Sequence, residues 1–404
     1  MAEGFISEGF TPLVHIEMDK DAINTLTTRT AYHYLKQCEK IDCYIQYLKK
    51  EISRNDLYST LPLELMSTIF NETISYESLN RVCDIIDNNM SAMNCTEVDG
   101  LIGGPPCQTY SIISRSNGKY QNEKDQRNHL YKLYAEILAK YSPKFFVFEN
   151  VPGIKTIKNG DLFRELLSLI ESKGYTVFPL ELNAMDFGVL QNRTRVIITG
   201  WKKEYNIKEM SYPISKNSQY IVNDALLDLY PLKPGEEINR YYSSPNNYLL
   251  NSGIRSNLEI PLTQHMCRYH NENDREIYKI AIDLWNTEKK RLVYSQLPSR
   301  LITRSNPDIF SDKYKVVAGD LPYSHTIIAH ISKDGHYYIH PDIKQARSIS
   351  VREAARIQSF PDDYFFEGTR QKVYTQIGNA VPPLMAKKIA QGIKEVLKNV
   401  QKRL

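Results

Sequence analysis

Residues 100–111, GLIGGPPCQTYS, place one cysteine, Cys107, on a glycine and proline turn directly after the apolar run from Gly100 to Ile102. The pattern predicts a strand and a βα turn, and open α/β sheets carry their chemistry at the carboxyl ends of their strands. A thiol exposed there can act as a nucleophile. A buried structural cysteine is the alternative for a lone Pro-Cys pair. The stretch therefore predicts an α/β fold and nominates Cys107.

Four further stretches follow the cysteine in chain order. Residues 145–150, FFVFEN, form an apolar run of strand type that carries Glu149 at its carboxyl end. Residues 191–195, QNRTR, lead into a β-branched run, and arginines at i and i+2 of an extended segment face one side, where they can pair with a carboxylate and with a phosphate or base oxygen. Residues 352–361, REAARIQSFP, precede residues 374–383, YTQIGNAVPP, which open an amphipathic helix.

Taken in order, these blocks resemble the cytosine-C5 DNA methyltransferases of bacterial restriction-modification systems. The signature blocks are Pro106-Cys107-Gln108, Glu149-Asn150-Val151, the Gln-x-Arg-x-Arg element and residues 378–381, GNAV. The resemblance covers most of the chain outside residues 53–98 and 205–320. It implies an α/β fold, with a Rossmann-like S-adenosylmethionine-dependent methyltransferase sheet and a smaller, mostly irregular target-recognition domain.

The resemblance also implies a role for each site residue. Cys107 would add to C6 of cytosine, and Glu149 would hydrogen-bond or protonate the ring at N3 and N4. Arg195 would hold the cytosine O2 or the adjacent phosphate, while Arg193 would orient Glu149 or the catalytic loop. Gln191 would support the loop by hydrogen bonding. Because these ring atoms are unreachable in a stacked duplex, the target base would be flipped out of double-stranded DNA.

Cofactor residues follow from a predicted strand at residues 13–17, LVHIE, which ends in an acid. Glu17 is placed to bind the ribose hydroxyls of S-adenosylmethionine. By the resemblance, Pro106 lines the cofactor pocket and Asn379 lies near the amino-acid end of the cofactor. Glu51 is either a contact to the adenine or part of a charged helix, and both interpretations stay open.

The chain departs from the family at its start, because residues 2–10, AEGFISEGF, match only the helix that follows the family's first strand and glycine-rich turn. That strand is central, so without it two interior strand edges would lack partners. We expect an amino-terminal truncation of about 12 residues, or a misplaced start. The alternative function is therefore a catalytically impaired DNA-binding subunit or pseudoenzyme.

Composition and the spacing of the motifs predict the domain organisation. The chain has 404 residues, 42% of them hydrophobic, and a formal charge of only +4, so positive potential for DNA must be local. We expect a catalytic methyltransferase domain at 1–204 and 372–404, with a helical insertion at about 53–98, and a target-recognition domain at 205–371. That long recognition region argues against a transfer-RNA methyltransferase of the same fold.

The cysteines indicate the compartment. The chain has six cysteines without secreted disulfide spacing, and neither a signal peptide nor a membrane-spanning run is recognisable, so we expect a cytoplasmic protein without membrane contact. His265, Cys267 and His270 lack the second ligand pair of a zinc site, so we expect no metal. The expected activity is modification of one cytosine in a short site, which protects host DNA from a cognate restriction endonuclease.

Overall fold

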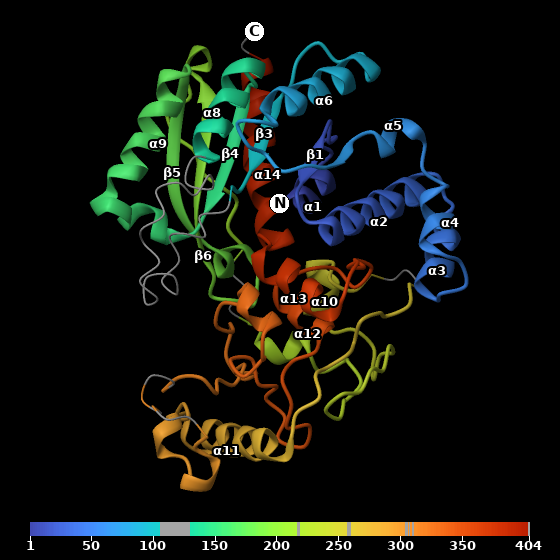
Figure 1. Ribbon diagram of the computed structural model, residues 1–404, viewed down its shortest axis with the longest axis vertical. Helices are drawn as coiled ribbons and strands as arrows, with labels where there is room; N and C mark the ends of the chain where they lie inside the picture. The colour runs from blue at the N-terminus through green and yellow to red at the C-terminus, as the bar shows by residue number, and fades with distance from the viewer. Residues whose placement is uncertain are drawn as a thin grey trace.

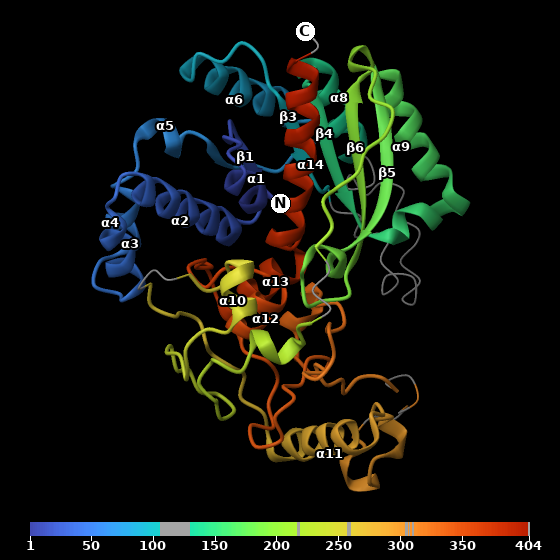
Figure 2. The same ribbon diagram turned by 180° about the vertical axis from the view of Figure 1, so that it is seen from behind.

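The computed structural model describes residues 1–105, 130–215, 219–256, 260–303, 306, 308 and 311–402. Figures 1 and 2 show an upper lobe of strands and helices above a lower lobe that is mostly irregular chain. The long C-terminal helix α14 (Pro383–Gln401) runs through the upper lobe. None of the helices in the described residues is both long and apolar enough to cross a membrane.

A four-stranded sheet forms the centre of the upper lobe. Its strands are β3 (Gly100–Gly103), β4 (Phe145–Asn150), β5 (Tyr175–Asn183) and β6 (Thr194–Lys202), in the order β3-β4-β6-β5. Strand β3 is parallel to β4, whereas β6 is antiparallel to both β4 and β5. The apolar run of β4 is buried, as expected for a strand with both faces covered by helices.

Successive side chains of β4 reach opposite faces of this sheet. Phe146 and Phe148 pack in the core beneath α8 (Leu130–Tyr141) and α9 (Asp161–Ser172). Phe145 and Val147 pack on the other side, against α14 and α1 (Ala2–Ser7). The period of two along a strand explains this division. Ile389 and Ile393 of α14 are buried there, so the apolar face expected for the last helix does dock on the sheet.

A separate two-stranded parallel sheet lies beside the first. It pairs β1 (His15–Glu17) with β2 (Ile69–Asn71). Among the described residues β1 and β3 each end a sheet without a further partner, which agrees with the expectation of two unpartnered interior edges. The helices of this part are α2 (Lys20–Gln37), α3 (Ile41–Leu48), α4 (Arg54–Tyr58), α5 (Leu63–Met66) and α6 (Leu79–Ala92).

The segment at 53–98, expected to be a helical insertion, differs from that expectation in one respect. It contains α4, α5 and α6, but also β2, which pairs with β1 in parallel register from His15 opposite Ile69. A strand of three residues is too short to show a period of two, so the helical spacing around it dominates the sequence pattern.

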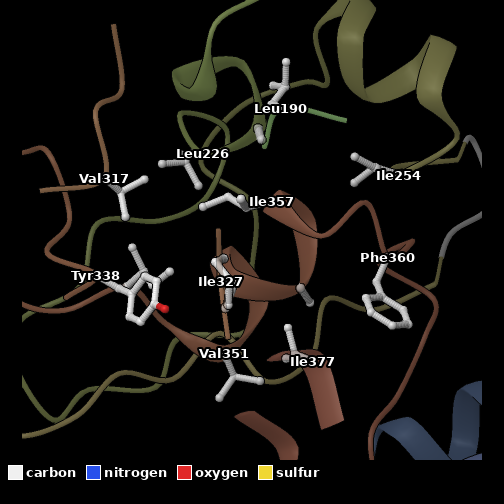
Figure 3. Close-up of a cluster of buried hydrophobic side chains, with 14 of the residues drawn as sticks. Leu190, Leu226, Ile254, Val317, Ile327, Tyr338, Val351, Ile357, Phe360 and Ile377 are labelled. Carbon is white, nitrogen blue, oxygen red and sulfur yellow. The ribbon is translucent and has the colours of Figure 1, made fainter. Parts of the chain in front are cut away.

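The lower lobe has its own core, shown in part in Figure 3, where Ile327, Ile357 and Ile377 converge. Its helices are α10 (Asn247–Ser252), α12 (Val351–Ile357) and α13 (Arg370–Asn379), while α11 (Glu272–Glu288) has a smaller cluster of its own. Short 3-10 helices lie at Pro152–Gly160, Ala184–Phe187, Lys203–Tyr205, Val222–Ala225, Tyr294–Gln296, Ser299–Leu301 and Ala329–Ser332.

Candidate active site

The structure brings Glu149 and Arg195 together. Glu149 is the last but one residue of β4, and Arg195 is the second residue of β6, whose antiparallel register sets Asn150 opposite Val196. The carboxyl end of one strand therefore meets the amino end of the other. The Nε atom of Arg195 lies 2.9 Å from Oε1 of Glu149, and the two side chains are 10% and 14% exposed. The Glu149 carboxylate is thus largely buried, and it forms its ion pair with Arg195 at the edge of the sheet.

The surroundings of this ion pair define how it can act. Burial lowers the pKa of Arg195, and the neighbouring Glu149 carboxylate opposes that shift. Nη1 of Arg195 donates to the carbonyl oxygen of Thr194 at 2.8 Å, whereas Nη2 makes no hydrogen bond within the described residues. Gly104 lies against the acid, since a Cβ there would sit 2.7 Å from Oε2 of Glu149. A side chain at position 104 would therefore displace the Glu149 carboxylate.

The turn that leads to the predicted nucleophile begins beside this pair. The Nδ2 atom of Asn150 donates to the carbonyl oxygen of Pro105 at 3.3 Å. Cys107 and Pro106 themselves lie outside the described residues.

Arg193 has different surroundings from Arg195. It is fully buried, and its guanidinium donates to the carbonyl oxygens of Ile327 at 2.6 Å, Gly378 at 3.0 Å and Ala380 at 2.9 Å. No ion pair of Arg193 occurs in the described part of the chain. Burial is the main cause that lowers its pKa to about 9, and the charge of Arg195 adds to it. Arg193 therefore fastens the start of β6 to the junction of α13 and α14.

Gln191 makes a second set of hydrogen bonds between the loop before β6 and the lower lobe. Its side chain is fully buried, and Nε2 donates to the Ile357 carbonyl oxygen at 3.2 Å and to Oε1 of Gln358 at 3.0 Å. Its own Oε1 accepts from the backbone N–H of Ile327 at 2.9 Å. Both hydrogen-bonding ends of the amide are thus occupied, and they join the loop before β6 to the lower lobe.

The predicted cofactor residues Glu17 and Asn379 lie on β1 and on α13. Glu17 ends β1, and its Oε1 accepts from the backbone N–H of Asp19 at 2.9 Å. Asn379 ends α13 and is exposed. Helix α13 is held to the segment after β1, because Nζ of Lys372 lies 2.7 Å from Oδ2 of Asp19.

Two residues beside Glu17 were not found from the sequence. Nδ2 of Asn71, at the end of β2, donates to the carbonyl oxygens of Glu17 and Met18, both at 3.0 Å. The Met18 side chain is 64% exposed. Glu51, for which two interpretations were left open, lies after the end of α3. The sequence signal that could have identified Asn71 is the short apolar run Ile69-Phe70 directly before it.

Comparisons with known proteins identify the family. A model of the C-5 cytosine-specific DNA methylases matches residues 70–395. The type II methyltransferase M.Bpa9945I of Bacillus paralicheniformis is 38% identical over 437 aligned positions, covering 98% of this chain and 96% of the relative. M.FnuDI of Fusobacterium nucleatum is 32% identical and covers 75% of this chain and 78% of the relative.

A solved structure shares the fold. A protein described as a prophage-encoded DNA modification methyltransferase of E. coli matches with a TM-score of 0.61 and 21% identity, covering 98% of this chain and 96% of that one. The family model and the sequence relatives therefore cover most of the chain, and the solved structure shares its fold. The chain belongs to the C-5 cytosine-specific DNA methylases.

Proposed function

We propose that the chain transfers a methyl group from S-adenosylmethionine to C5 of a cytosine flipped out of double-stranded DNA at one specific short site. The observation that carries this proposal is the Glu149–Arg195 ion pair beside the turn that leads to Cys107. We further propose that it is the modification enzyme of a type II system with a cognate restriction endonuclease, since relatives bear that name.

The described residues fit the nucleoside end of S-adenosylmethionine. Glu17 offers carboxylate oxygens at a strand end, where they can accept from ribose hydroxyls. Asn71 holds the backbone of Glu17 and Met18, and the exposed Met18 side chain offers an apolar surface to a base. Asn379 presents an exposed amide that suits the polar amino-acid end. When bound, this cofactor supplies the methyl group that C5 accepts.

In the proposed reaction the chain's own residues activate and release the ring. The Cys107 thiolate forms a bond to C6, which moves an electron pair into the ring toward N3. Glu149 holds a proton at N3, and Nη2 of Arg195 donates to O2. Once C5 carries the methyl group, its proton passes to solvent water. The electron pair of that C–H bond then restores the C5–C6 double bond as the bond from Cys107 to C6 breaks and Cys107 leaves as a thiolate.

Base flipping follows from the same requirement. The sulfur must approach C6 perpendicular to the ring, and in a duplex this face is covered by neighbouring bases. Replacement of the base beside the target by 2-aminopurine tests the step, because unstacking raises its fluorescence. We expect the fluorescence to rise when the chain binds its site and to stay unchanged with DNA of another sequence.

The activity is tested by transfer of a labelled methyl group to DNA. We expect transfer by the wild type, none by Cys107→Ala, and wild-type transfer by the control Cys38→Ala, which replaces an exposed cysteine on α2's end. An oligonucleotide that carries 5-fluorocytosine should form a covalent adduct with the wild type and with Cys38→Ala but not with Cys107→Ala. Transfer by Cys107→Ala at the wild-type rate would refute the proposed nucleophile.

A catalytically impaired DNA-binding subunit, the alternative given by the sequence, is the second candidate. Tight, site-specific DNA binding without cofactor binding or methyl transfer would support it. Bisulfite sequencing of host DNA, compared with a deletion strain, identifies the modified site. DNA from the deletion strain should also become sensitive to the proposed endonuclease.

A further inference from the structure

Asp19, two residues after Glu17, makes hydrogen bonds in three directions. Its backbone N–H donates to Oε1 of Glu17 at 2.9 Å. Its Oδ1 accepts from the backbone N–H of Asp21 at 2.9 Å and from that of Ala22 at 3.3 Å, which caps the start of α2. Its Oδ2 lies 2.7 Å from Nζ of Lys372, in the first turn of α13. Asp19 therefore joins the Glu17 carboxylate, the start of α2 and the start of α13.

Asp19 and Lys372 form an ion pair that is open to solvent. Their side chains are 36% and 50% exposed, respectively. Burial acts to raise the pKa of Asp19, but the hydrogen bonds from Lys372 and from the backbone N–H groups of Ala22 and Asp21 outweigh it and lower that pKa. The hydrogen bond to Asp19 raises the pKa of Lys372. Both groups are therefore charged at neutral pH, and the strength of the pair depends on the salt concentration.

Helix α13 and the segment before it contact α2 at a second place. The hydroxyl of Thr25, in the second turn of α2, donates to Oε1 of Gln376 at 2.8 Å and accepts from the backbone N–H of Glu367 at 2.8 Å. Thr25 is buried, so this contact is part of the packing between the two helices. It does not involve Asp19. Among the residues that the structure describes, Lys372 is the one side chain that bonds the Asp19 carboxylate.

The far end of α13 is held independently of Lys372. Arg193 donates to the carbonyl oxygens of the residues before and after Asn379. Lys372 and Asn379 are seven residues apart on the helix, which corresponds to about 10 Å. Loss of the Lys372 ion pair should therefore act on the Glu17 end of the cofactor site and leave the Asn379 end in place.

We propose that Lys372 is a positioning residue for the ribose of S-adenosylmethionine, which it orients by acting on Glu17 through Asp19. The ion pair holds the backbone of Asp19 where its N–H binds Oε1 of Glu17, so that Oε2 faces the ribose hydroxyls. The inference rests on the proposed function, because it takes Glu17 as the residue that binds the ribose. Lys372 thereby sets the affinity for the cofactor and does not take part in the chemical step.

The charge of Lys372 has a second effect, of opposite sign, on the same ligand. S-adenosylmethionine carries a net charge of +1, because its sulfonium adds to a zwitterionic amino acid, so a nearby ammonium repels it. S-adenosylhomocysteine has the same ribose but no sulfonium and no net charge. Positioning of the ribose therefore affects both ligands equally, whereas charge repulsion affects only the first. A comparison of the two ligands separates the two effects.

The test measures ligand binding to the full chain by isothermal titration calorimetry. Lys372→Met keeps the length of the side chain but removes its charge and its donor. We expect the Kd of S-adenosylhomocysteine to rise by about twofold to fivefold. An analogue that lacks both ribose hydroxyls should bind to the variant and to the wild type alike. The rate of methyl transfer at saturating cofactor should stay within about twofold of the wild-type rate.

Three control variants isolate the role of Lys372. Lys372→Arg keeps the charge and the donor, so it should bind S-adenosylhomocysteine as the wild type does. Lys140→Met removes an ion pair of similar exposure, 2.8 Å from Asp87, between α8 and α6, and should leave the Kd unchanged. Thr25→Val breaks the second contact between α2 and α13. It should lower the free energy of unfolding and leave the Kd unchanged.

The positioning of Asp19 can be measured without any ligand. The amide of Asp19 donates to Glu17, so its hydrogen exchange in the free chain reports on that bond. We expect exchange at this amide to be about twofold to fivefold faster in Lys372→Met than in the wild type, and unchanged in Lys140→Met.

Three results would overturn the proposal. The first is a wild-type Kd for S-adenosylhomocysteine in Lys372→Met. The second is an equal rise of the Kd in Thr25→Val, which would mean that docking of the helices is what matters. The third is a change with S-adenosylmethionine alone. A wild-type chain that binds neither ligand would contradict the proposed function and this inference with it, whereas equal binding by the wild type and Lys372→Met contradicts this inference alone.

Discussion

Arg195 and Glu149 form an ion pair across the junction of β6 and β4, with Nε 2.9 Å from Oε1. The fork of the guanidinium leaves Nη2 without a hydrogen bond among the described residues, while Nη1 is held by the carbonyl oxygen of Thr194. One side chain can thus orient the acid and still offer a donor to an incoming base. This arrangement is set before substrate arrives, which is the basis of electrostatic preorganisation.

Glu149→Gln tests the acid. The substitution keeps the size of the side chain but cannot deliver a proton to N3, so we expect methyl transfer in a single turnover to slow by about 10²- to 10⁴-fold. DNA affinity should change little. The control is Asp161→Asn, which removes the acid of an exposed ion pair with Arg164 on α9. A Glu149→Gln enzyme of normal rate would show that the carboxyl group is not the acid.

Arg195→Lys tests whether the several N–H donors of the Arg195 guanidinium are needed. Lysine keeps the charge and can still reach Glu149, but it has no second planar donor for the base. We expect the single-turnover rate to fall by about tenfold to a hundredfold, with a smaller change in the free energy of unfolding. Arg164→Lys serves as the matched exposed control. If Arg195→Lys loses only stability and keeps its rate, Arg195 acts through folding alone.

Arg193→Met tests whether Arg193 stabilises the junction between the start of β6 and helices α13 and α14. The change leaves the carbonyl oxygens of Ile327, Gly378 and Ala380 buried without their donor, so we expect unfolding to require about 2 to 4 kcal/mol less free energy. Urea unfolding followed by circular dichroism measures this. Arg164→Met, at a side chain that is 67% exposed, should change the value by less than about 1 kcal/mol. Equal effects in both variants would contradict the assignment.

The sequence predicted the meeting of Glu149 with an arginine, because both residues flank apolar strands. It assigned the contact with Glu149 to Arg193 and the contact with the base to Arg195, whereas in the structure it is Arg195 that forms the ion pair with Glu149. A spacing of two predicts a common side only if both residues are in the strand, and β6 begins at Thr194, after Arg193. Arg193 lies before the strand, so the alternation of side chains along β6 does not apply to it. Its guanidinium instead donates to backbone carbonyl oxygens of the lower lobe. That partner set is distant in sequence and gives no local pattern.

The cofactor side was predicted only in part, for a related reason. Glu17 follows a recognisable apolar run, so its position at a strand end was readable. Asn71 follows a strand of three residues inside a helical segment, and only the pairing of β2 with β1 brings it to Glu17. Pairing between strands so far apart in sequence leaves no periodic trace, so its partner had to come from the structure.

The histidines of the lower lobe predict how stability depends on pH. Burial lowers the pKa of His340 to about 4 and that of His270 to about 3, with nearby cations adding to both shifts. An unfolded histidine titrates near pH 6.5, so between about pH 4 and 6.5 the unfolded chain binds more protons than the folded one. Stability is therefore complete above about pH 6.5 and falls as the pH decreases below it.

These two side chains contribute about 2 to 3 kcal/mol to a fall in the free energy of unfolding between pH 7.5 and pH 5.5. His15 and His325, whose pKa values burial lowers to about 4, add to that fall. Urea unfolding at the two pH values measures the difference. His270→Gln can still hydrogen-bond to Ser348 and Tyr278 but does not titrate, so it should make the difference smaller by about 1 kcal/mol. Carboxylates with depressed pKa values, such as Glu353, act only below about pH 4.5, so they do not produce this decline. Stability that is the same at both pH values would mean that these histidines are accessible to protons in the folded chain.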